Sequence, residues 1–304
     1  MVRSSGTKTI VTRDKDPTGL RGVQKRFDQE VGLGGRPSTS LTEIKLLLKK
    51  GTALTLNLIG SELTLADALA LEKAMPPAPD GHQILCGEGS IDVARGVITG
   101  APFKELELTA ADAALIRASC WSAGVQTLEL ELGHSLPIKS LTKGPSPPLS
   151  TCRITADDMP LLCGLMALDR SKAVTKLDLP ANQFGDDGAI TLARQLATGA
   201  LPGLLCLNLS ANNLSDVAVE ELAAAAADGG MARLVELHLG SNPSISNDGL
   251  SALGYNARGG ASFRELQTLE LSGCSIGSSG VEALADDFAE GAMPSLQASH
   301  LHLL

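Results

Sequence analysis

The sequence predicts an α/β solenoid, with a curved parallel β-sheet on the concave side and helices on the convex side. Three observations predict it. A leucine pattern recurs every 30 to 32 residues in the second half of the chain, alternating leucines give each repeat a short strand, and a run of small apolar residues at helical spacing follows. A unit of one strand and one helix buries its apolar face only against its neighbours, so the repeats are expected to stack into one extended core.

Four copies of the pattern L-x-x-L-x-L-x-x-N-x-L form the regular part of the array, beginning at Val174, Leu204, Leu234 and Leu266. The two residues of L-x-L fall on the same face of a strand, because side chains alternate across it. At the ninth position, an amide or thiol can satisfy backbone groups that the turn leaves exposed. We therefore expect the ninth-position side chains of successive repeats to form a structural ladder, a row that bonds to the backbone. This row includes Cys152, from a degenerate copy upstream: Cys152, Asn182, Asn212, Asn242 and Cys274.

A polar turn and a helix rich in small residues complete each repeat. The turns contain Asp, Asn, Ser and Gly, and their side chains can accept the free N–H groups of a first helical turn. The apolar runs that follow predict helices over residues 189–196, 217–226, 250–253 and 281–288.

This pattern resembles the leucine-rich repeats, and its long repeat with a capped helix is similar to the ribonuclease-inhibitor subtype. Cys274 at the ninth position agrees with the alternation of Asn and Cys in that family. The resemblance covers about residues 103–304 and implies a leucine-rich-repeat solenoid. Ankyrin and tetratricopeptide repeats have similar periods but lack L-x-L followed by Asn.

The first half of the chain carries the pattern in degenerate form. Strand signatures at 103–108 and 125–130 begin only 22 residues apart, which leaves room for a turn rather than a full helix. We expect a flexible basic segment at residues 1–40 and a solenoid at 41–304, with degenerate repeats over 51–173 and regular repeats over 174–304. The Pro-rich stretch 144–149 is an alternative linker between two solenoid segments, although the 30-residue offset continues across it.

Composition and charge disfavour several classes of function. Aromatic residues make up 2% of the chain and the net charge is -9, which argues against a nucleic-acid surface of basic patches and stacked rings. The charge is uneven, since residues 1–50 carry +6 and leave -15 for the rest. No apolar run is long enough to span a membrane.

Six cysteines at uneven separations, without a C-x-x-C pair, are typical of reduced thiols. We therefore expect a cytoplasmic protein, with the nucleus as the alternative compartment. An N-terminal transit peptide is a further alternative, against which Asp14 and Asp16 count.

Sequence motifs for catalysis are missing: there is no phosphate-binding loop, no zinc-protease helix and no nucleophile elbow. Among the five histidines only His300 and His302 are close in sequence, and no cysteine or carboxylate lies near them in sequence. The sequence therefore predicts no enzyme activity, no cofactor and no metal site.

Carboxylates are concentrated at the outward positions of the predicted strands. The third, fifth and seventh positions of nine candidate units hold eight acids and the single base Lys176. A negative concave face attracts a basic protein surface, whereas in the alternative explanation the acids only keep an open sheet soluble. The predicted partner-binding residues are Glu105, Glu107, Glu129, Glu131, Asp178, Glu236, His238 and Glu270.

We therefore expect a non-catalytic protein–protein interaction scaffold whose acidic concave face binds a basic partner. One alternative is a GTPase-activating protein of the Ran-activator type, which is built from similar repeats, but the loops at 59–62 and 133–135 contain no Arg to stabilise phosphoryl transfer. Another is the sensor region of an innate-immunity-like signalling protein, although no nucleotide-binding module precedes the repeats. The sequence stops inside a unit at 296–304, so we also expect a fragment, or self-association through an uncapped end.

Overall fold

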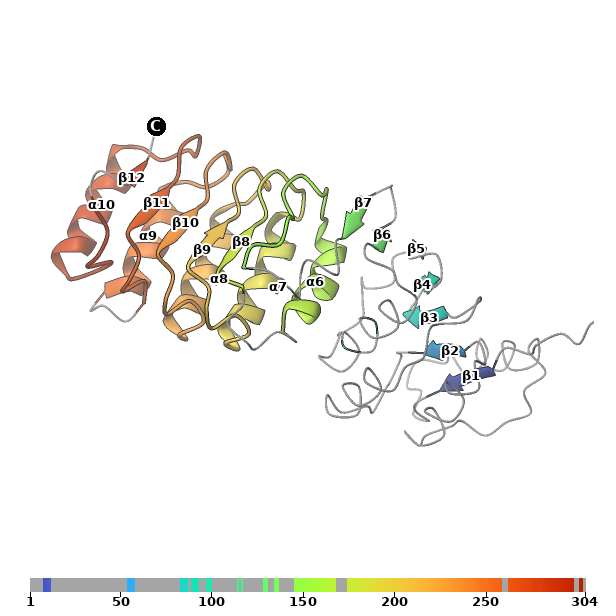
Figure 1. The fold of residues 1–304 in the computed structure, drawn as a ribbon. Coiled ribbons are helices and arrows are strands. Elements are labelled where there is room, and N and C mark those ends of the chain that lie inside the picture. The colour runs from blue at the N-terminus through green and yellow to red at the C-terminus, as the bar shows by residue number, and fades with distance from the viewer. Residues whose placement is uncertain are drawn as a thin grey trace, which may run out of the picture. The chain divides into compact units, whose positions relative to one another are not determined.

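The computed structural model describes residues 145–167, 174–258 and 262–297, together with Ala114, Ile116 and the backbone of eight short strands outside those ranges. The chain divides into two compact units, Met1–Ile138 and Lys139–Leu304. Figure 1 shows the strands and helices of both units. No helix in the described part of the chain is long and apolar enough to cross a membrane.

The N-terminal unit contains a seven-stranded sheet in chain order. Its strands are β1 (Lys8–Val11), β2 (Leu54–Asn57), β3 (Gln83–Cys86), β4 (Gly89–Asp92), β5 (Val97–Thr99), β6 (Leu128–Leu130) and β7 (His134–Leu136). Strands β1 to β3 pair in parallel, but β3–β4, β4–β5 and β6–β7 pair antiparallel. Short connections permit such hairpins, whereas a parallel neighbour needs a long crossover.

Strand β1 lies inside the segment 1–40 that the sequence predicts to be flexible, and the flexibility of that segment stays a prediction. The solenoid bounds 41–304 also stay a prediction; the described strands fall into two sheets.

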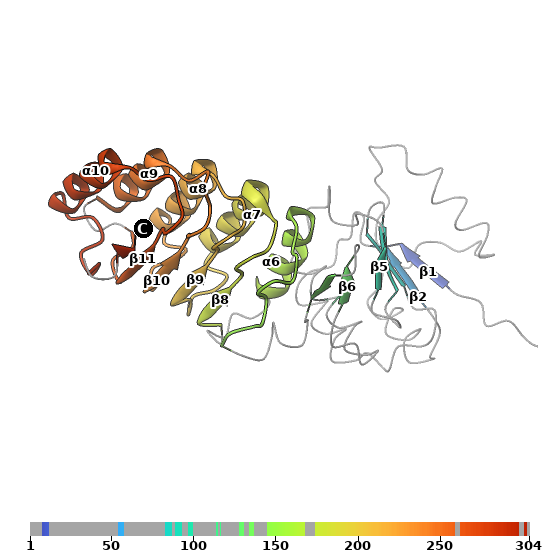
Figure 2. The same ribbon diagram turned by 90° about the horizontal axis from the view of Figure 1, so that it is seen from above.

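The C-terminal unit has the strand–helix alternation that the leucine pattern predicts. A parallel five-stranded sheet contains β8 (Lys176–Asp178), β9 (Cys206–Asn208), β10 (Glu236–His238), β11 (Thr268–Glu270) and β12 (Leu301–His302) in that order. The helices are η1 (Ala156–Asp158), α6 (Met159–Ala167), α7 (Gly185–Ala197), α8 (Asp216–Ala227), α9 (Asn247–Ala257) and α10 (Ser278–Ala289). Strands form one layer and helices another (Figures 1 and 2).

Each helix begins earlier than the apolar pattern predicts, because the polar turn forms its first turn. In α8 the Ser215 hydroxyl accepts the N–H of Val217, and in α9 the Ser246 hydroxyl accepts the N–H of Asp248. These N-caps satisfy donors that have no partner inside the helix.

The core is a column of leucines in register. Leu177, Leu207, Leu237 and Leu269 face one another across β8 to β11, and each is fully buried. Because side chains alternate along a strand, the third and fifth positions of each repeat must lie on the other face of the sheet.

The ninth-position amides link neighbouring repeats. Asn212 is fully buried, and its Oδ1 accepts the N–H of Asn182 at 3.0 Å. Its Nδ2 donates to the carbonyls of Leu179 at 2.9 Å and Leu209 at 3.0 Å. Asn242 makes the equivalent bonds one repeat later, since its Oδ1 accepts the N–H of Asn212 at 2.9 Å and its Nδ2 donates to the carbonyls of Leu209 and Leu239. One repeat earlier, Asn182 Nδ2 donates to the carbonyls of Leu149 and Leu179, but its Oδ1 accepts the N–H of Ile154 at 3.0 Å.

The two cysteines at the ninth position donate weaker bonds. The thiol of Cys274 lies 3.5 Å from the carbonyl of Leu239, and that of Cys152 lies 3.7 Å from the carbonyl of Pro148. A thiol is a weak donor with no second polar atom, so these positions hold the turn with fewer bonds than Asn provides.

Candidate functional site

The candidate site is the face of the C-terminal sheet opposite the buried leucines, which we call the open face. It is formed by the third and fifth residues of four repeats: Lys176, Asp178, Cys206, Asn208, Glu236, His238, Thr268 and Glu270. The parallel register aligns the third residues in one row and the fifth residues in a second row.

Three predicted carboxylates and His238 lie on this face, but they differ in how freely they could bind a partner. The Glu236 side chain is 48% exposed. Asp178 lies 3.4 Å from the ammonium of Lys176 and accepts a hydrogen bond from Asn208 Nδ2 at 2.9 Å. Glu236 is therefore more available than Asp178.

Glu270 has a structural role on the same face. Its two oxygens accept the backbone N–H groups of Gly240 at 3.1 Å and Ser272 at 2.9 Å. The approach is so close that a Cβ at Gly240 would lie 2.7 Å from Glu270 Oε1. A side chain at position 240 would therefore displace the Glu270 carboxylate from its place against the backbone.

The other predicted acids belong to the N-terminal unit. Glu129 lies in β6, where its backbone pairs with Val97 and Ser135, while its side chain lies outside the described residues. Glu105, Glu107 and Glu131 also lie outside the described residues.

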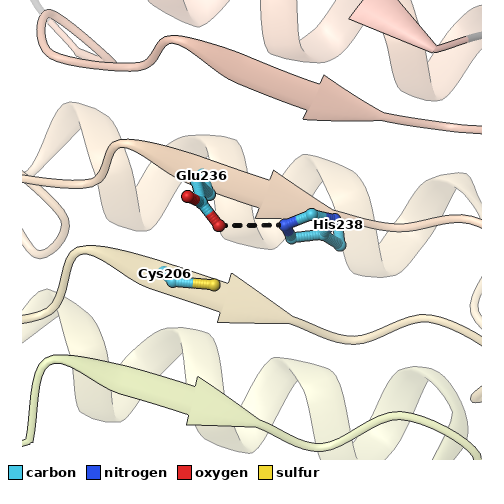
Figure 3. Close-up of side chains that lie close together, drawn as sticks. All are labelled: Cys206, Glu236 and His238. Atoms are coloured by element: carbon cyan, nitrogen blue, oxygen red, sulfur yellow. Dashed lines mark hydrogen bonds and ion pairs between the residues drawn. The ribbon is translucent and has the colours of Figure 1, made fainter. Parts of the chain in front are cut away.

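A compact group of three different side chains lies near the middle of the open face. Cys206, Glu236 and His238 each contribute one atom, and these sulfur, oxygen and nitrogen atoms all lie within 4.8 Å of one another (Figure 3). His238 Nε2 is 3.4 Å from Glu236 Oε2, longer than the usual hydrogen bond of about 2.7–3.2 Å. The sequence analysis identified Glu236 and His238 for partner binding but did not include Cys206.

The three residues and Lys176 influence one another electrostatically. Burial raises the pKa of the Cys206 thiol to about 12, and the hydrogen bond to Glu236 and its negative charge act in the same direction. Partial burial would raise the pKa of Glu236, but hydrogen bonds from Cys206 and His238 outweigh it and lower that pKa below its ordinary value. At neutral pH the group therefore contains a protonated thiol beside a carboxylate.

A comparison with known protein families agrees with the strand–helix pattern. The family model described as Leucine Rich repeat matches residues 171–193, 233–254 and 264–285. With the parallel sheet and its layer of helices, these matches confirm the predicted fold class: the unit Lys139–Leu304 is an α/β leucine-rich-repeat solenoid.

Among solved structures, an internalin from Listeria monocytogenes matches at 15% sequence identity with a TM-score of 0.29. The match covers 84% of this chain and 69% of the internalin chain. No curated protein matches the sequence.

Proposed function

We propose that the protein is a non-catalytic interaction scaffold whose open face binds a basic partner protein. Leucine-rich-repeat solenoids present an extended sheet surface for protein partners. The observation that supports the proposal most directly is the charge of that surface. The described residues of the open face include three carboxylates, those of Asp178, Glu236 and Glu270, and a single ammonium, that of Lys176.

Glu236 is the residue through which this attraction is expected to act. Asp178 is paired with Lys176, and Glu270 accepts two backbone N–H groups. Glu236 also contacts Cys206 and His238, but its side chain is 48% exposed and so stays accessible to a partner. An exposed carboxylate beside an incoming Lys or Arg contributes about 0.2–1 kcal/mol and weakens with salt. Selective binding therefore requires several such contacts along the face.

We also propose the ribonuclease-inhibitor-like subtype and a cytoplasmic or nuclear setting. Helices α7 to α10 have 11 to 13 residues each, which supports the long type of repeat. The four described cysteines, Cys152, Cys163, Cys206 and Cys274, are free thiols, which supports a reducing compartment.

Charge reversal on the sheet and on a helix tests the scaffold proposal. The full chain is titrated with a lysine-rich peptide at low and at physiological ionic strength. Glu236→Lys should weaken binding about fivefold, because it replaces an attraction with a repulsion of similar size. The matched control is Glu220→Lys, which makes the same charge change at an exposed position of helix α8.

The control should alter the dissociation constant less than about twofold. Equal weakening by both variants would mean that the peptide responds only to net charge, and the proposed face would be rejected.

A further inference from the structure

Cys206, Glu236 and His238 bring three kinds of metal-binding atom together: a sulfur, a carboxylate oxygen and an imidazole nitrogen. The parallel register places Glu236 directly opposite Cys206 on the neighbouring strand, and His238 follows two residues later on the same face. The group therefore comes from two strands of a rigid sheet, and the sheet fixes the separation of its Cα atoms.

The spacing of the donor atoms is close to that of a tetrahedral zinc site. With Zn–N and Zn–O bonds of about 2.0–2.2 Å and Zn–S bonds of about 2.3 Å, ligand atoms lie about 3.3–3.6 Å apart. The Glu236 Oε2 to His238 Nε2 distance is 3.4 Å, and all three atoms lie within 4.8 Å. Atoms at the 4.8 Å limit would have to approach one another by about 1 Å to reach the spacing of a tetrahedral site.

The donor set also selects the metal. Thiolate and imidazole favour Zn²⁺ over Mg²⁺ and Ca²⁺, which prefer oxygen ligands. When Zn²⁺ binds, the Cys206 thiol releases its proton to solvent, and the resulting thiolate and the Glu236 carboxylate together balance the charge of the divalent ion.

The surroundings leave one coordination position open. Two polar side chains opposite His238 are engaged elsewhere: Glu270 accepts the N–H groups of Gly240 and Ser272, and Asn208 donates to Asp178 and accepts from Ser210. Thr268, opposite Glu236, offers only a neutral hydroxyl, which is not among the usual protein ligands of zinc. The Glu236 and His238 side chains are 48% and 27% exposed. A fourth ligand would therefore come from solvent or from a bound molecule.

We propose that Cys206 Sγ, Glu236 and His238 bind one Zn²⁺ ion on the open face, with the fourth position directed to solvent. This site goes beyond the scaffold function and does not depend on it, since it requires no protein partner. Lys176 lies on β8, opposite Cys206 on β9. Its ammonium is the one side-chain cation among the described residues of the open face that would repel the zinc ion.

Zinc alone is the probe for the test. The full chain without a tag is titrated with Zn²⁺ against a chromophoric chelator, and Co²⁺ is used to detect a thiolate-to-metal charge-transfer band. We expect one ion per chain at this site. Cys206→Ser, Glu236→Gln and His238→Gln should each weaken binding by more than the 10–100-fold typical of losing an outer-shell partner, and Cys206→Ser should abolish the cobalt–thiolate band.

Two variants serve as matched controls. Cys274→Ser removes a half-buried thiol from the ninth-position ladder, and Asp178→Asn removes a carboxylate from the open face outside the group. Both should retain zinc affinity and the cobalt band. Lys176→Gln should strengthen binding, because it removes a neighbouring positive charge.

Circular dichroism of each variant separates loss of the ligand from loss of the fold, and Cys206→Ser changes only one atom of the side chain. Failure of the wild-type chain to bind Zn²⁺ would overturn the proposal. So would zinc binding that survives both Cys206→Ser and His238→Gln, since the ion would then be held elsewhere.

Discussion

Replacing Asn212 with Ala removes one rung of the amide ladder and should destabilise the C-terminal unit far more than a surface change. The side chain is fully buried and bonds to groups in two repeats. Without its Oδ1, the N–H of Asn182 loses the acceptor that lies 3.0 Å away. A buried N–H without a partner costs about 1–3 kcal/mol.

The carbonyls are less affected, because each keeps a second donor. Leu179 O also accepts from Asn182 Nδ2 at 2.9 Å, and Leu209 O accepts from Asn242 Nδ2 at 3.2 Å. Adding the net loss of their two bonds to Asn212, about 0.5–1.5 kcal/mol each, to the cost of the unpaired N–H gives an expected loss of about 2–6 kcal/mol for the variant.

The assay is urea unfolding of the full chain, followed by the helical circular dichroism signal. The control is Asn213→Gly, at an exposed neighbour with φ of 59° that glycine adopts without strain. The control should change the free energy of unfolding by less than about 0.5 kcal/mol. If Asn212→Ala were no more destabilising than this control, the ladder would not be what joins the repeats.

Three further predictions concern helices α6, α9 and α10. Gly254→Ala should destabilise the unit by about 1–3 kcal/mol in the same assay, because its Cβ would lie 2.6 Å from Asp287 Cγ; an unchanged midpoint would refute this contact. Arg258→Ala should lower the unfolding midpoint, because it leaves the carboxylate of Asp287, which is 2% exposed, without the guanidinium that lies 2.7 Å away. Adding Asp287→Asn removes that charge and should restore part of the lost stability. No recovery in the double variant would contradict the pairing. Burial raises the pKa of Cys163 to about 12, so iodoacetamide at pH 8 should label this thiol only after unfolding. The half-buried Cys152 should react in the folded chain. Equal labelling rates of the two cysteines by mass spectrometry would contradict the burial of Cys163.

The inward leucines could be predicted because a single physical constraint determines them. Each repeat has one strand, and only alternate side chains of a strand can face the helices, so L-x-L identifies the core residues directly. Leu177 and Leu207 are fully buried, as this argument requires. Helix starts were harder to predict, since the polar residues after each strand serve both as turn and as first helical turn.

The sequence analysis did not find the proposed zinc-binding group, because it looked for ligands that are close together in sequence. In a parallel sheet with a 30-residue period, the residue beside Glu236 is Cys206, thirty positions earlier. Aligning the outward positions of successive repeats would have brought the two together. The structural role of Glu270 could not be predicted in this way, since it depends on how closely the carboxylate approaches the backbone of Gly240.

Both functional proposals require that outward residues of successive repeats lie side by side in register, and a disulfide tests this most directly. Neighbouring strands are about 4.8 Å apart, within the range of about 4.4–6.8 Å for Cα atoms joined by a disulfide. Thr268 lies opposite Glu236 and so two strands from Cys206, about twice that distance. After mild oxidation and proteolysis, mass spectrometry should find Cys206 linked to the cysteine of Glu236→Cys but not to that of Thr268→Cys. Absence of the first link, or equal formation of both, would contradict the register.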